Sequence, residues 1–179
     1  MIVADNSIQV CTFQAAPPHI QESLRVALGA QRKALNEIFK RIGVGAALWV
    51  RENEGLRFSD GFNVEHQMPQ LATCAEQSAI SVAINVGYQD SCVGITVVAQ
   101  RVQDMRNRII LPCDLCRPRL RQVAERSGVG DSFSVVCALP TYRRRGSKFL
   151  VTDLGTLLSD PRLRYSPDGI DIQSLLMVP

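Results

Sequence analysis

The sequence has few aromatic residues, little excess charge and no long apolar run. Aromatic side chains make up 6% of the 179 residues, and 20 basic residues face 17 acidic ones, for a formal net charge of +3. This balance, without aromatic residues interleaved among basic ones, argues against a polymeric nucleic acid as partner. No apolar run approaches the roughly 20 residues of a transmembrane helix. The first residues lack the basic leader and apolar region of a signal peptide, so we expect a cytoplasmic protein without a membrane partner.

The remaining composition is that of an ordinary globular protein. Hydrophobic residues make up 46% and charged residues 21% of the chain, which leaves little room for disorder. The length fits one domain, which we place at residues 19–160. An irregular N-terminal extension is expected at 1–18, and a loosely patterned C-terminal extension at 161–179.

Hydrophobic periodicity predicts an alternation of helices and strands. The predicted helices cover 19–41, 74–86 and 114–125, and the predicted strands cover 44–50, 56–64, 93–99, 132–139 and 148–152. This order favours an α/β fold, a three-layer α/β/α sandwich with one mixed sheet and helices on its faces.

Six cysteines are the most informative feature of the composition. An even number allows three disulfides, but a reducing compartment and a chain long enough to bury a core argue against them. The two-residue gap between Cys113 and Cys116 lets two thiolates meet one metal ion. A redox pair has the same spacing, so this motif alone does not decide.

The residues around the cysteines favour a metal site. Pro112 precedes Cys113, and the tripeptide Cys-Ala-Glu stands upstream at 74–76. Zinc deaminases combine one Cys or His, a Glu two residues later, and Pro-Cys-x-x-Cys. Three protein ligands leave the fourth tetrahedral position open for water, whereas a structural zinc site is normally closed. We therefore predict that Cys74, Cys113 and Cys116 bind Zn²⁺, and we leave the nearby His66 unassigned.

Glu76 is the predicted proton shuttle. The segments after the ligands are predicted helices, so the cysteines would lie at helix N-termini, where the dipole favours thiolates. Zinc lowers the pKa of its water toward 7, and a neighbouring carboxylate can take that proton and pass it to a ring nitrogen and a leaving amine. A lone Glu at this position would otherwise be a solvated residue of the first helical turn.

Together these residues resemble the small zinc-dependent cytidine deaminases of nucleoside salvage, over about residues 20–160. The matching segments are VGAAL at 44–48, GFNVE at 61–65, CAEQSAI at 74–80 and PCDLCR at 112–117. The resemblance implies a cytidine deaminase-like fold with a five-stranded mixed sheet flanked by helices. It also implies a homotetramer, or a homodimer, because members with three cysteine ligands usually form homotetramers whose neighbouring subunits complete the active sites.

The resemblance assigns substrate-binding roles to three further residues. It implies that Asn63 and Glu65 hold a ribose hydroxyl, which an amide and a carboxylate can do. It implies that the backbone N–H of Ala75 polarises the base carbonyl or the zinc-bound oxygen. Without the resemblance, Asn63 and Glu65 read as surface residues at a strand end.

The presumed base pocket departs from the family pattern at three places. Ile42-Gly43 stands where the family has Phe-Pro, which removes base stacking worth about 1–3 kcal/mol unless another ring supplies it. Gln77 replaces an Arg that offsets the charge of three thiolates, and Arg117 is the candidate to compensate. The segment 66–71 also differs from the family's usual residues.

The sequence favours hydrolytic deamination of a cytidine-type nucleoside to the uridine-type product, with release of ammonia. The altered pocket leaves open a modified cytosine nucleoside, such as a blasticidin-type antibiotic, or another amino-heterocycle of a biosynthetic pathway. A zinc-stabilised scaffold without activity is the alternative from another class. Either enzyme reading implies a small nucleoside-like substrate as the partner.

Overall fold

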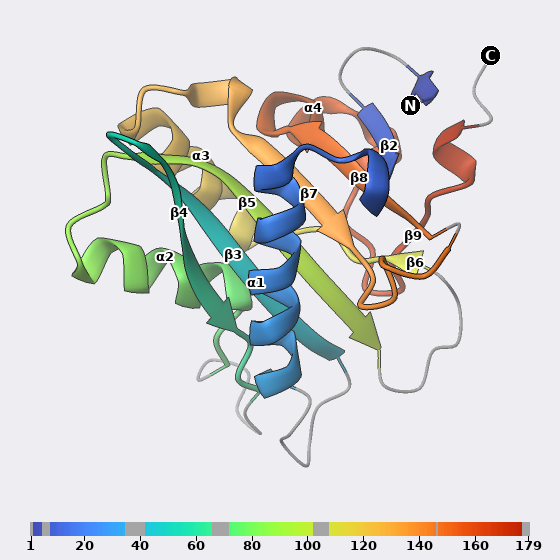
Figure 1. Cartoon of the computed structure of the whole chain (residues 1–179), viewed down its shortest axis with the longest axis horizontal. Helices are drawn as coiled ribbons and strands as arrows, with labels where there is room; N and C mark the ends of the chain where they lie inside the picture. The colour runs from blue at the N-terminus through green and yellow to red at the C-terminus, as the bar shows by residue number, and fades with distance from the viewer. Residues whose placement is uncertain are drawn as a thin grey trace.

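A seven-stranded mixed sheet forms the centre of the computed structural model, which describes residues 2–4, 8–34, 42–65, 72–101, 108–145 and 147–176 (Figure 1). Its strands are β1 (Ile2–Ala4), β2 (Ile8–Thr12), β3 (Ile42–Glu52), β4 (Gly55–Phe62), β5 (Cys92–Arg101), β7 (Ser134–Ala138) and β8 (Lys148–Asp153). Their order is β1-β2-β8-β7-β5-β3-β4. Strands β5 and β7 run parallel, and the other neighbours are antiparallel.

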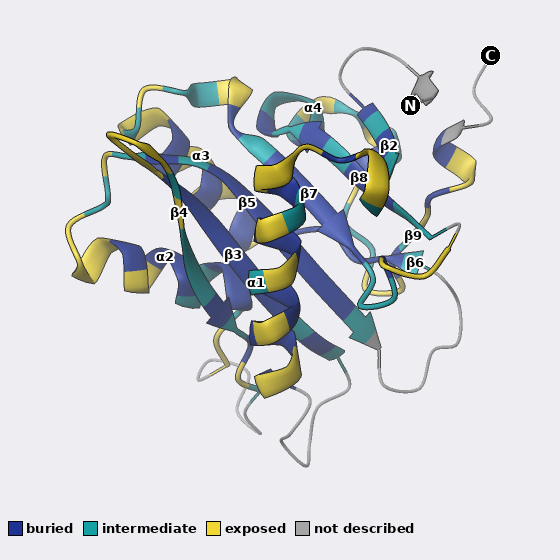
Figure 2. Cartoon of the chain, viewed as in Figure 1, coloured by how far each residue is buried: buried dark blue, intermediate teal, exposed yellow. Residues whose placement is uncertain are grey.

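Helices cover both faces of this sheet. Helix α1 (Pro18–Ala34) packs on one face, and α2 (Ala75–Asn85), α3 (Cys116–Arg126) and α4 (Leu154–Ser159) pack on the other. Along β3, Leu48 belongs to the hydrophobic cluster of α2 and α3, whereas the next residue, Trp49, belongs to that of α1. The central strands are therefore buried on both faces (Figure 2), and the predicted three-layer α/β/α fold is confirmed.

Two glycines let the helices approach the sheet closely. A Cβ atom at Gly45 would lie 2.1 Å from the carbonyl oxygen of Ala27 in α1. A Cβ atom at Gly61 would lie 2.3 Å from the backbone nitrogen of Ala79 in α2. Because the obstacle is backbone in both cases, neither position has room for a side chain. Gly61 thereby fixes α2, whose N-terminus carries Cys74, against β4.

The prediction of five strands was too low, because the N-terminal segment is part of the sheet. Residues 1–18 were expected to be irregular, but β1 and β2 lie there, and β2 pairs with β8. The reason is burial: Ile8 and Val10 alternate along β2 and are 1% and 7% exposed. Pro18, within the segment expected to be irregular, is the first residue of α1, where its missing N–H costs nothing.

The C-terminal segment also packs on the domain more than its pattern predicts. It contributes a 3₁₀ turn (Pro161–Leu163), β9 (Ile170–Asp171) and a second 3₁₀ turn (Ser174–Leu176). Strand β9 pairs with β6 (Arg108–Ile109). Leu163, Ile172 and Leu175 are buried in the core cluster of α2 and α3.

The predicted helix and strand positions otherwise agree closely with the structure. The predicted helix at 19–41 corresponds to α1, but its residues 35–41 lie outside the described residues. The helix predicted at 74–86 corresponds to α2, which ends just before Gly87; this glycine adopts a φ of 87°, which it tolerates without strain. Among the described residues, no helix has the length and apolarity to cross a membrane.

Candidate active site

The predicted zinc ligands lie together. The sulfur atoms of Cys74, Cys113 and Cys116 are all within 4.8 Å of one another, and the Sγ atoms of Cys74 and Cys113 are 3.8 Å apart. Zinc–sulfur bonds of about 2.3 Å at tetrahedral angles place two sulfurs about 3.8 Å apart. The cluster therefore fits one zinc ion. Among the described residues no fourth His, Cys, Asp or Glu joins it, and His66 lies outside those residues.

Two helix N-termini present these thiols. Cys74 occupies the N-cap of α2, and Cys116 is the first residue of α3. Cys113 lies in the turn before α3, where its carbonyl accepts hydrogen bonds from the N–H groups of Cys116 and Arg117 at 2.9 and 3.0 Å. Both helices direct their positive dipole ends toward the cluster, which stabilises thiolates.

The three thiols are electrostatically coupled. Hydrogen bonds from the thiols of Cys116 and Cys74 lower the pKa of Cys113 to about 2. The same sharing with Cys113 raises the pKa of Cys74 to about 12 and raises that of Cys116. Because the metal ligand is the thiolate, a dication bound at this cluster would displace the thiol protons.

Glu76 lies beside the cluster without belonging to it. It is the second residue of α2 and only 5% exposed, so the alternative of a solvated glutamate is wrong. Burial raises the pKa of Glu76 to about 7, and the charge of Cys113 adds to this. A carboxyl group with a pKa near neutrality can both accept and return a proton.

A cavity of about 220 Å³ opens over these residues. Its polar and acidic lining consists of Asn63, Glu65, Thr73, Cys74, Glu76 and Cys113. Ala75 also lines it, and as the first residue of α2 its N–H is not needed for a helical hydrogen bond. Cys116 is buried next to the cavity as the third thiol of the cluster. The structure thus brings all seven predicted site residues to one place.

The comparisons with known proteins agree with this geometry. Residues 18–131 match the family model described as the cytidine and deoxycytidylate deaminase zinc-binding region. The chain belongs to this family.

Three known proteins are similar to this chain. A probable cytidine deaminase of Dictyostelium discoideum is 39% identical over 95 residues, which cover 50% of this chain and 55% of that protein, so the match spans about half of the relative's length. The cytidine deaminase of Burkholderia pseudomallei superimposes with a TM-score of 0.61 at 28% identity, over 81% of this chain and 98% of that one. The cytidine deaminase of Mycobacterium leprae, at 23% identity and a TM-score of 0.54 over 80% and 99% of the chains, shows the shared fold alone.

In this family member, Asn63 has a structural contact that the sequence did not predict. Its Oδ1 accepts a hydrogen bond from the N–H of Val44 at 2.8 Å, and its Nδ2 donates to the carbonyl of Ile42 at 2.9 Å. Asn63 is 7% exposed, so its reading as a surface residue was wrong. It ties the end of β4 to the start of β3, which is also the wall of the cavity. Glu65, in contrast, is half-buried.

Arg117 lies buried behind the CxxC turn. Its Nε donates to the carbonyl of Pro112 at 2.9 Å, its Nη1 to that of Leu157 at 2.9 Å, and its Nη2 to that of Leu163 at 2.6 Å. Burial lowers the pKa of the guanidinium, but an arginine remains charged in proteins. The structure therefore places a buried cation near Cys113, at the position from which compensation for Gln77 was expected.

The other cysteines are outside this site. All six thiols are free, as predicted. Cys92 and Cys137 are buried, and burial raises the pKa of both. Cys11 is half-buried in β2. Inert buried thiols of this kind behave as small apolar side chains.

Sequence reasoning missed part of the cavity. Val97 in β5 and Ile110 and Leu111 before the CxxC turn form apolar walls, and Tyr165 reaches the cavity from the C-terminal segment. The apolar residues carry no signal that separates them from ordinary core residues. Tyr165 lies far from every motif in the sequence, and only the path of the chain brings it here.

Proposed function

We propose that the protein is a zinc-dependent hydrolytic deaminase that converts a cytidine-type nucleoside to the uridine-type product and releases ammonia. The observation that carries the proposal is one cavity lined by a thiol cluster of zinc-binding geometry and a buried Glu76. A structural zinc site has no use for such a carboxylate. The named relatives are cytidine deaminases, which supports cytidine as the substrate.

The residues divide the chemistry as follows. Zinc, when bound by the three thiolates, supplies an activated water for attack on the amino-bearing ring carbon. Glu76 transfers two protons of the attacking water in turn: the first goes to the ring nitrogen and the second to the amine, whose bond to the ring carbon then breaks to release ammonia. The N–H of Ala75 donates to oxygen at the reacting centre, at the positive end of the α2 dipole.

Asn63 and Glu65 bind the ribose in this proposal. Both line the cavity on the side formed by the end of β4. Val64, which lies between Asn63 and Glu65 in the sequence, is linked to Thr73 by two backbone hydrogen bonds, each 2.9 Å long. This bridge holds the ribose-binding side of the cavity at a fixed position relative to Cys74, which follows Thr73 in the chain.

No structural observation favours the other readings of the sequence. A blasticidin-type substrate or another amino-heterocycle was inferred from the missing aromatic residue at Ile42 and from Gln77, and none of the named relatives carries such a description. The comparisons point to an enzyme family, which disfavours a scaffold without activity.

Assembly and location belong to the same proposal. We expect a homotetramer or homodimer. Exposed apolar side chains at the end of α2 and before α3 support this expectation. Val82, Ile84 and Val86 are 45%, 48% and 61% exposed, and Leu115 is 74% exposed. Burial of these side chains against a partner subunit would stabilise an assembly. Light scattering of the purified chain measures the assembly. A cytoplasmic location is supported by the six free thiols.

The decisive experiment measures zinc content and ammonia release on the same preparation. We expect one zinc per chain and ammonia from cytidine, with free cytosine and blasticidin-type nucleosides tested in parallel. If the protein holds one equivalent of zinc and releases no ammonia from any substrate, the proposed enzymatic activity is rejected. Ammonia from a different nucleoside alone would keep the reaction class and change the substrate.

A further inference from the structure

A second cavity lies outside the catalytic site. Its volume is about 270 Å³, and its walls come from three segments: β6, the connection from β7 to β8, and the residues after β9. None of the described residues that line it also lines the catalytic cavity. The two cavities are neighbours along the chain, because Ile109 lines the second one and Ile110 lines the catalytic one. The proposed deamination gives this second cavity no role.

Two cationic side chains line this cavity. Lys148, the first residue of β8, is half-buried, and Arg145 is exposed. Among the described residues, no carboxylate lines the cavity or pairs with either cation. Arg143, two residues before Arg145, lies instead over the ring of Phe13, 5.6 Å from its centroid. A phosphate group suits Arg145 and Lys148, because its three terminal oxygens accept hydrogen bonds from both side chains at once.

The rest of the lining suits a sugar. The hydroxyls of Thr141 and Ser147 and the amide of Gln173 supply neutral donors and acceptors. The apolar part is aliphatic and includes Ile109 and Ile172, which are 0% and 6% exposed. No aromatic ring occurs among the described lining residues, so the cavity lacks the surface on which a nucleobase stacks. The lining thus offers partners for hydroxyl groups and aliphatic surface for the C–H groups of a sugar.

Backbone hydrogen bonds shape the turn that carries most of these polar side chains. The N–H of Arg144 donates to the carbonyl of Thr141 at 2.8 Å, and the N–H of Ser147 donates to the carbonyl of Arg144 at 3.0 Å. Lys148 then begins β8, where it pairs in register with Thr12 of β2. This wall of the cavity is therefore a hydrogen-bonded turn that leads into a strand of the main sheet.

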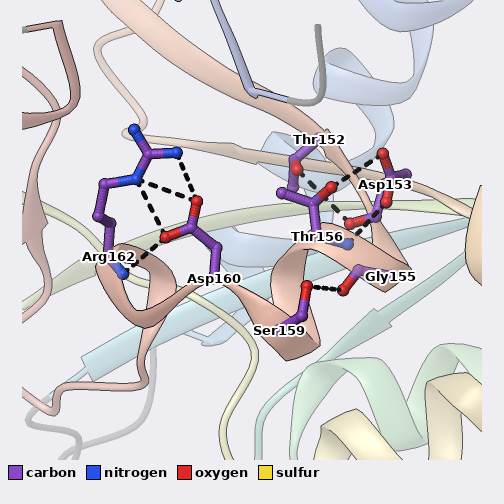
Figure 3. A network of polar contacts seen from close by, with 7 residues as sticks. All are labelled: Thr152, Asp153, Gly155, Thr156, Ser159, Asp160 and Arg162. Atoms are coloured by element: carbon purple, nitrogen blue, oxygen red, sulfur yellow. Dashed lines mark hydrogen bonds and ion pairs between the residues drawn. The ribbon is translucent and has the colours of Figure 1, made fainter. Parts of the chain in front are cut away.

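Polar contacts also hold the wall that the C-terminal segment forms. Asp153 ends β8 and caps α4, and Asp160 accepts from the N–H of Arg162 at 2.8 Å and pairs with its guanidinium (Figure 3). Further along the chain, the Oδ1 of Asp171 accepts from the N–H of Gln173 at 2.9 Å, and β9 pairs with β6. Both walls of the cavity are therefore held by the fold.

We propose that this cavity binds a sugar phosphate, whose phosphate group contacts Arg145 and Lys148. The sugar hydroxyls bind Thr141, Ser147 and Gln173, and the C–H groups pack on the aliphatic side chains. The size agrees with this ligand, because pockets for drug-sized molecules enclose about 300–1,000 Å³, and a cavity just below that range suits a phosphorylated monosaccharide. The site is separate from the proposed deaminase site.

Ribose 5-phosphate is the probe, titrated by calorimetry into the zinc-loaded full chain. Arg145→Gln and Lys148→Gln should each weaken its binding about 10- to 100-fold, the loss expected for one charged hydrogen bond. Arg144→Gln is the matched control, because Arg144 lies in the same turn, is exposed and does not line the cavity. Removal of such a screened charge should change the affinity by about twofold or less. Equal losses in all three variants, or no binding to the parent, overturns the proposal.

Three further ligands test the chemical class. Ribose and inorganic phosphate should each bind at least about tenfold more weakly than ribose 5-phosphate, because each lacks one set of contacts. Inorganic phosphate that binds as tightly as ribose 5-phosphate would indicate an anion site and overturn the sugar assignment. UMP should bind this site no more tightly than ribose 5-phosphate, because no ring stacks on its base. Tighter binding of UMP that is lost in Arg145→Gln would make the ligand a nucleotide and contradict the proposal.

Activity measurements separate this site from the catalytic one. The KM for cytidine should be parental in Arg145→Gln, since Arg145 does not line the catalytic cavity. A KM that rises in parallel with the loss of ribose 5-phosphate binding would assign Arg145 to the catalytic cavity and remove the second site. Because the titrations need no turnover, a parent protein that binds ribose 5-phosphate but releases no ammonia would reject the proposed function and support this site.

Discussion

The Nη2 of Arg117 donates a hydrogen bond of 2.6 Å to the carbonyl of Leu163, 46 residues further along the chain. Arg117 belongs to the helix that begins at Cys116, and Leu163 belongs to the segment that brings Tyr165 to the cavity. One buried cation thus joins the metal-binding turn to the C-terminal segment. Its guanidinium donates hydrogen bonds to three backbone carbonyls, so it stabilises the position of the chain itself.

Arg117→Gln should destabilise the fold. The shorter neutral side chain leaves up to three buried carbonyls without their charged donor, at a cost of about 3 kcal/mol in the free energy of unfolding. Urea denaturation measures this value. Arg121→Gln is the control on the same helix, because its ion pair with Asp131 at 3.0 Å is exposed and contributes at most about 1 kcal/mol. Equal losses for the two variants would contradict the anchoring role.

Glu76→Gln should retain zinc and lose turnover. Glutamine has nearly the same shape but cannot carry the proton, so kcat should fall by about 10²- to 10⁴-fold. Metal analysis and an ammonia assay on the same sample measure both quantities. Unchanged turnover would show that another group shuttles the proton.

Cys113→Ser should lose zinc, because the hydroxyl replaces a thiolate in a site with three protein ligands. Removal of the metal with a chelator should also lower the unfolding midpoint of the parent protein, since a ligand bound only by the folded state stabilises it. Cys11→Ser, outside the cluster, should keep the parental zinc content. Full zinc content in Cys113→Ser would remove this residue from the ligand set.

Glu65→Gln should weaken the binding of nucleosides more than the binding of free bases. Loss of a charged hydrogen bond to the ribose predicts a KM for cytidine raised about 10- to 100-fold, with little change for cytosine. Glu65 is a cleaner site for this test than Asn63, because the amide of Asn63 also holds the backbone of Ile42 and Val44. A parallel loss for cytidine and cytosine would exclude a ribose-specific role.

Asp160→Asn should change how stability depends on pH. Hydrogen bonds from Arg162 hold the pKa of Asp160 below its ordinary value of 3.8. A carboxylate with a lower pKa in the folded state stabilises the protein above its unfolded pKa, and this contribution is lost as the pH falls through the folded pKa. The parent should therefore be more stable than Asp160→Asn at about pH 6, and the difference should shrink toward about pH 2. Denaturation curves at several pH values would contradict this if the difference stayed constant.

The agreement between sequence and structure is best where the signal is local. The helix after Cys74 and the helix after Cys113 are each predicted by short apolar patterns, and both appear where expected. The strand at Ile8–Thr12 was missed, because two apolar residues in so short a segment do not distinguish a strand from a loop. The segment is a strand because it pairs with β8, which lies far along the chain.

The sequence by itself determined the chemistry of the site. Three cysteines at the spacing of zinc ligands and a glutamate two residues after the first predict zinc-dependent deamination, because this combination is typical of zinc deaminases. Only the tertiary structure decided how the cavity is closed. The burial of Glu76, the anchoring of Asn63 to β3 and the arrival of Tyr165 depend on contacts between distant segments, and no local pattern encodes those contacts.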